Sequence, residues 1–121
     1  MSTFSVTEAA ERFFKKEKKI QREMESRRVK AQAFARDLAQ KLGESDGSLV
    51  QVVGFGSTFE TWRHYREDSD IDLGLIGGDW NKLMEILPIC EFEVSLITLA
   101  HQSGQFKEQV QKNGVVLYEK C

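Results

Sequence analysis

The chain has 121 residues, with 17 Lys and Arg against 19 Asp and Glu, so its formal net charge is −2. That length fits one ordinary domain, and the 40% hydrophobic content excludes wholesale disorder. No run approaches the ~18–20 apolar residues that span a bilayer, and no apolar signal-peptide core is present, so we expect no membrane contact and a cytoplasmic location. Cys90 and Cys121 lack CxxC spacing, which excludes a cysteine-rich metal site.

The charge is divided unevenly along the chain. Residues 1–42 carry 11 basic and 6 acidic side chains, a net of +5, whereas residues 43–121 carry 6 and 13, a net of −7. This division predicts a partner-facing basic segment joined to a carboxylate-bearing globular unit. We place the boundary of a helical extension at residues 1–25 and the globular domain at 26–121.

The first segment predicts a helix over residues 5–42. Ser5 and Glu8 have the spacing of a capping box, no Gly or Pro follows before Leu42, and Gly43 supplies a stop signal. An unbroken helix would be ~55 Å long at ~1.5 Å per residue. Either it breaks near the polar residues 25–28, or its first half projects from the domain.

The rest of the chain alternates strand and helix patterns, which predicts an α+β fold with a mixed sheet flanked by helices. In chain order we expect a strand over 49–53, a helix over 58–65, a strand over 70–76, a helix over 79–87, a strand over 92–99, a helix over 102–112 and a strand over 115–118.

Paired carboxylates mark the strand over 70–76. Asp70 and Asp72 project from one face of that strand, while Ile71, Leu73 and Leu75 point into the core. Two ionised carboxylates this close repel each other unless a cation neutralises them, and Mg²⁺ suits such a pair because it takes one or two carboxylates together with water and phosphate oxygens.

A Gly-Ser turn precedes this strand. Gly56 lets the backbone approach a phosphate closely, and Ser57 with the amides of the following helix would present donors to an anion. Either motif alone is usually a turn or a solvated face. Together they predict a metal–triphosphate site, in which positioning and charge neutralisation carry phosphoryl or nucleotidyl transfer.

A third carboxylate is expected from the strand over 92–99. Glu91 and Glu93 lie on one face, opposite the apolar Phe92, Val94 and Leu96, and we favour Glu93 because it lies further into the strand. It would bind metal and accept the proton of the acceptor hydroxyl.

These motifs resemble the signature of the DNA polymerase beta-like nucleotidyltransferase superfamily, and the small size and the ending Gly114-Val115-Val116-Leu117-Tyr118 resemble its minimal nucleotidyltransferases. The resemblance implies two Mg²⁺ ions, with ATP or another NTP as substrate. By position, the catalytic and metal-binding residues would be Asp70, Asp72 and Glu93. The nucleotide-binding loop would be Gly56 and Ser57. The acidic Glu60 is unfavourable near a triphosphate unless it points away, and Arg63, His64 or Arg66 could restore positive charge, so we add Arg63 and Arg66 to the nucleotide-binding residues.

The resemblance also implies transfer of a nucleoside monophosphate to a hydroxyl on a partner macromolecule, as in the antitoxins that adenylylate an all-helical HEPN partner. We prefer a protein acceptor, and nucleic acid is disfavoured because acidic residues interrupt the basic helix. The alternative is a weakly active or inactive subunit that docks a helical partner through residues 1–25, motivated by Glu60 after the Gly-Ser turn. A helix-driven homodimer is a third possibility.

Overall fold

The computed structural model describes residues 6–61, 65–66 and 69–120. The elements follow the expected alternation after one long helix. In chain order they are α1 (Val6–Ser45), β1 (Leu49–Phe55), β2 (Ile71–Gly77), α2 (Trp80–Glu85), β3 (Val94–Thr98), the short 3-10 helix η1 (Leu99–His101), α3 (Gly104–Asn113) and β4 (Val115–Glu119).

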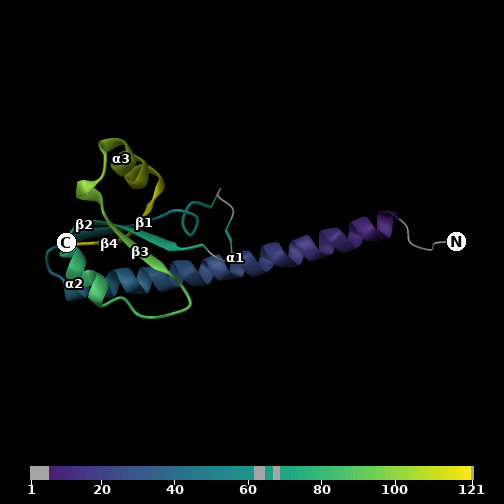
Figure 1. Cartoon of the computed structure of the whole chain (residues 1–121), viewed down its shortest axis with the longest axis horizontal. Helices are drawn as coiled ribbons and strands as arrows, with labels where there is room; N and C mark the ends of the chain where they lie inside the picture. The colour runs from purple at the N-terminus through teal and green to yellow at the C-terminus, as the bar shows by residue number, and fades with distance from the viewer. Residues whose placement is uncertain (1–5, 62–64, 67–68, 121) are drawn as a thin grey trace.

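The four strands form one mixed sheet with the order β3-β2-β1-β4. β1 is antiparallel to β2 and to β4, whereas β2 and β3 run parallel. The helices α1 and α2 lie on one side of this sheet and α3 lies on the other (Figure 1). The predicted α+β fold with a mixed sheet and a long N-terminal helix is therefore confirmed.

The main core lies between the sheet and the second half of α1. Ala31, Ala35 and Ala39 are fully buried on the helix, and small side chains there let the helix axis approach the sheet. Leu73 and Leu75 of β2 meet this helix as the period-two pattern predicts. A smaller apolar cluster on the opposite face holds α3 against the sheet.

α1 is continuous over its 40 residues, and its first half projects away from the domain (Figure 1). The structure therefore decides between the two possibilities for this helix: it projects and does not break. None of the helices in the described part of the chain has an apolar stretch long enough to cross a membrane.

Gly43 does not stop α1, so that prediction is wrong. The helix continues through Gly43 to Ser45. A Cβ at this position would overlap the ring of Tyr118, at 2.7 Å from its Cδ2 atom and closer to others. Glycine is therefore needed at position 43, because the side chain of Tyr118 on β4 packs directly on the helix backbone. The predicted capping residue at the other end of the helix, Ser5, lies outside the described residues.

The helix expected over 58–65 is not formed by the described residues of that segment. A single turn follows β1, in which the amides of Phe59 and Glu60 both donate to the Gly56 carbonyl, at 3.1 and 2.8 Å. Residues 62–64 lie outside the described part of the chain. We call residues 56–60 the β1 turn.

Asp46 ties three segments together where α1 ends. Its carboxylate accepts hydrogen bonds from the Ser48 hydroxyl at 2.6 Å, from the Asp79 amide at 2.7 Å and from the Ser48 amide at 2.9 Å. These bonds favour the ionised form and lower the pKa of Asp46 from 3.8 to about 2. Asp79 in turn caps α2, because its carboxylate accepts from the amides of Asn81 and Lys82.

Because the pKa of Asp46 is lower in the folded chain, the carboxylate stabilises the fold above its ordinary pKa, and this contribution disappears as the pH falls through about 2. An Asp46→Asn variant is therefore expected to melt at a lower temperature than wild type near neutral pH, with the difference shrinking in acid. Thermal unfolding followed by circular dichroism, from neutral pH down to acid, measures this difference in melting temperature. Asp37→Asn, at an exposed position, is the control. A difference that stays constant with pH would contradict this role.

Candidate active site

Asp70 and Asp72 stand at the start of β2, on the side of the sheet that α3 covers. Ile71 and Leu73 between and beyond them are fully buried in the main core, so the strand's alternation turns both aspartates the other way. Both are half-buried. Asp72 therefore faces the space between β1, β2 and α3, and Asp70 immediately precedes the strand.

The backbone of Gly56 lies directly against the carboxylate of Asp72. In the β1–β2 ladder Phe55 is the partner of Asp72, so Gly56 is the first residue beyond it. Gly56 has φ +75°, and a Cβ there would overlap the Asp72 Oδ2 atom. Glycine is required twice at this position, by the left-handed backbone and by the carboxylate beside it.

The β1 turn is tied to the start of β2 by Thr58. This side chain is fully buried, and its hydroxyl donates to the Asp70 carbonyl at 3.1 Å. This bond holds the turn that contains Gly56 and Ser57 beside the residues at the start of β2.

Two side chains of α1 hold the same turn from below. Arg28 Nε donates to the Ser57 carbonyl at 3.1 Å, and Gln32 Nε2 donates to the Thr58 carbonyl at 2.8 Å. Arg28 is only 5% exposed, whereas most basic residues of the same helix are exposed. Arg28 lies three residues before the buried Ala31 and seven before Ala35. This spacing puts it on the same face of the helix and is the sequence feature that indicates its burial.

A cleft of about 430 Å³ opens beside Gly56 and Asp72. We call it the α3 cleft. It is lined by Phe55, Gly56, Glu60, Asp72, Phe106, Gln109, Val110 and Asn113. The rings of Phe55 and Phe106 meet edge to face at 5.9 Å, giving the cleft an apolar wall opposite its carboxylates.

Glu60 is buried, at 6% exposure, and lines the α3 cleft together with Asp72. A carboxylate beside a triphosphate is unfavourable unless its side chain points away, and Glu60 instead lines the cleft. No Lys, Arg or His is among the described residues that line the cleft. A polyanionic ligand therefore needs an added cation here.

Glu93 is exposed and lies immediately before β3. Its carbonyl accepts from the Ile71 amide at 2.8 Å, and the β2–β3 register pairs Asp72 with Ser95, two residues further on. Within the described residues, no three Asp, Glu, His or Cys side chains gather closely enough to hold a metal. The third-carboxylate role of Glu93 stays a prediction.

Glu91 is engaged elsewhere. Its carboxylate lies 3.8 Å from Arg27 Nη1 on α1, and its carbonyl accepts from Arg27 Nη2 at 3.5 Å. The predicted nucleotide-binding residue Arg66 is exposed and closes a turn with Ser69, whose hydroxyl accepts from the Arg66 amide at 2.8 Å. The predicted Arg63 lies outside the described residues.

No protein-family model and no curated protein matches the chain. Among solved structures it is similar to a toxin–antitoxin determined with AMP-PNP, at 24% identity and a TM-score of 0.55. It is also similar to a variant of the toxin–antitoxin MntA-HpeT, at 20% identity and a TM-score of 0.54. Each match covers 70% of this chain and 73% of the other. At these identities the likeness concerns the fold alone, and this chain shares the α+β fold of these two neighbours.

Proposed function

We propose that this protein is a nucleotidyltransferase of a toxin–antitoxin pair, which moves a nucleoside monophosphate, AMP from ATP, to a hydroxyl of an all-helical, HEPN-like protein partner. The observation that carries the proposal is the contact between Gly56 and the Asp72 carboxylate at the mouth of the α3 cleft. Bare backbone beside a carboxylate pair lets a phosphate and its counter-cation approach together.

The donor set of this site fits Mg²⁺ bound with a nucleotide. Asp70 and Asp72 supply two carboxylates, and the phosphate oxygens of the substrate complete a shell that Mg²⁺ prefers to share with water. When bound, the ion supplies charge neutralisation at the phosphates.

The chain's own residues bind and orient the reactants. The triphosphate would lie over Gly56 and Ser57, on a turn held by Thr58, and the base would enter the α3 cleft against the Phe106 ring. As the acceptor oxygen bonds to the α-phosphorus, the bond to the bridging oxygen breaks and pyrophosphate leaves. Glu93 takes the proton of the acceptor hydroxyl.

The exposure of Glu93 supports a macromolecular acceptor, because the acceptor side of the site is open to a protein surface. The solved neighbours support the rest. One is a toxin–antitoxin with AMP-PNP, and the other carries glutamate in place of two aspartates two positions apart, which is the spacing of Asp70 and Asp72.

The test is incubation of the purified chain with Mg-ATP and proteins that co-purify with it, followed by mass spectrometry. We expect an AMP adduct on a hydroxyl-bearing side chain of a partner, dependent on both Mg²⁺ and ATP. Calorimetry of the chain alone with Mg-ATP separates binding from transfer. Heat without an adduct would contradict turnover, and neither heat nor adduct would favour a docking subunit that has lost nucleotide chemistry.

A further inference from the structure

The projecting half of α1 carries apolar side chains that no described part of the chain covers. Phe13 is 60% exposed, Phe14 61% and Ile20 47%. In Figure 1 this half of the helix extends well beyond the sheet. Exposed aromatic and branched side chains on one helix are costly in water and commonly mark an interaction surface.

The exposed apolar residues continue the stripe that packs on the sheet. Phe13, Ile20 and Met24 are separated by seven and four residues, and Met24 is followed at steps of seven by the buried Ala31 and Leu38. Positions at these steps lie along one line of an α-helix. The surface that meets the sheet over residues 31–42 thus continues through the partly buried Met24 to the exposed Ile20 and Phe13, and we call the part over residues 13–24 the outer stripe.

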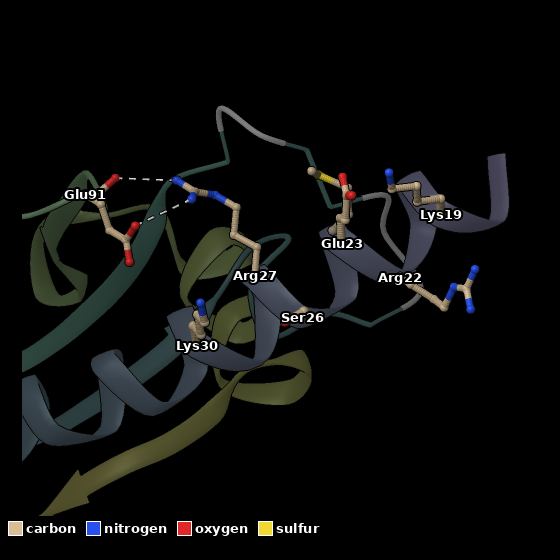
Figure 2. Close-up of a pocket in the computed structure, with 8 residues that line it drawn as sticks. Lys19, Arg22, Glu23, Ser26, Arg27, Lys30 and Glu91 are labelled. Carbon is tan, nitrogen blue, oxygen red and sulfur yellow. Dashed lines mark hydrogen bonds and ion pairs between the residues drawn. The ribbon is translucent and has the colours of Figure 1, made fainter. Parts of the chain in front are cut away.

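A basic groove of about 460 Å³ lies where the outer stripe reaches the domain. Its lining includes four cationic side chains, Lys19, Arg22, Arg27 and Lys30, with Met24 at its apolar side. Figure 2 shows these cations along α1, with Glu91 reaching Arg27 from the segment before β3. Apart from Glu91, Glu23 is the one carboxylate of the lining.

We propose that the outer stripe and this basic groove bind an acidic amphipathic helix of a partner protein. The seven-and-four spacing suits a helix that packs its own apolar stripe alongside, and the cations at the flank suit Glu or Asp beside that stripe. The proposal concerns α1 alone and does not depend on nucleotide transfer in the α3 cleft.

Charge argues against the two other occupants. A second copy paired through the outer stripe would set basic residues 12–22 against the same basic residues, at a cost in like-charge repulsion. Nucleic acid would meet Glu11, Glu17 and Glu23 among the lysines, and it offers nothing to the Phe13 side of the helix.

The probe is a synthetic peptide of ~4 heptads with Leu at positions a and d and Glu at e and g, titrated into the full chain by fluorescence anisotropy. The control peptide has Lys in place of Glu. We expect the acidic peptide to bind at least ~10-fold more tightly than the basic one, and its affinity to fall as salt is raised. Hydrogen exchange should show new protection in residues 7–24 and none in β1 or β2.

Two matched variants locate the surface. Ile20→Glu, on the outer stripe, should weaken binding of the acidic peptide by about 10-fold or more, because a charge replaces a central apolar contact. Val29→Glu makes the same change at another exposed residue on the opposite side of α1 and should alter it by less than about 2-fold. Equal binding of the two peptides, equal effects of the two variants, or a dimer of the chain alone that Ile20→Glu dissolves would each overturn the proposal.

Discussion

Asp72→Asn is expected to abolish the calorimetric heat of Mg-ATP binding and to lower nucleotidyl transfer by more than about 100-fold. Substituting residues that only support metal ligands costs about 10–100-fold, so losing a ligand should exceed that range. The substitution keeps the size of the side chain beside Gly56 and removes only the charge. Thermal unfolding should therefore change little while binding is lost.

Two comparison variants make this result specific. Asp37→Asn removes an equal charge from an exposed position on α1 and should leave binding and transfer unchanged. Gly56→Ala keeps Asp72 but adds a methyl group where its carboxylate lies, at a position with φ +75°, and should impair Mg-ATP binding as well. If Asp72→Asn and wild type bind Mg-ATP with equal heats, the carboxylate pair is not the nucleotide site.

The strands could be predicted because the alternation of apolar and polar residues that defines each one lies within its own segment. The alternation of Ile71, Leu73 and Leu75 with Asp70 and Asp72 defines β2 and its two faces without reference to any other segment. Asp79 caps α2 and Ser103 caps α3, each through side-chain hydrogen bonds to amides no more than three residues away. Such caps are therefore also local features of the sequence. Fold class and the placement of both aspartates follow from such local patterns.

The rest depends on contacts between distant segments. The polar residues of the β1 turn suit a helix as well as a loop, and what fixes them is Thr58 bonding to β2 and Gln32 reaching from α1. Glycine commonly ends a helix, yet Gly43 lies within α1 because the ring of Tyr118 on β4, 75 positions away, leaves no room for a side chain there. The buried position of Arg28 could not be predicted for the same reason, because the Ser57 carbonyl that it binds lies 29 positions away.

Arg28 is one of two α1 residues, with Gln32, that hold the β1 turn at the candidate site. Arg28→Met keeps most of the buried stem and removes both the Nε donor to the Ser57 carbonyl and the more exposed ion pair with Glu25 at 3.1 Å. A hydrogen bond from a charged donor contributes about 1.5–3 kcal/mol, so we expect the free energy of unfolding to fall by about 2 kcal/mol. Because the β1 turn then loses its support, Mg-ATP affinity should fall about 10-fold in protein that is still folded. Urea unfolding and calorimetry on the same samples measure the two effects.

Neighbouring substitutions separate positioning from simple loss of stability. Arg27→Met removes a partly exposed pair with Glu91, 3.8 Å apart, and should cost about 1 kcal/mol or less without changing nucleotide affinity. Arg28→Lys restores a charge but not the Nε geometry, so it should recover little of the affinity. Gln32→Leu releases the adjacent Thr58 carbonyl, and its effect on affinity should be less than additive with that of Arg28→Met because both bonds hold one turn. If Arg28→Met destabilises the chain but binds Mg-ATP like wild type, the arginine supports the fold alone, and α1 reaches the active site only through the core.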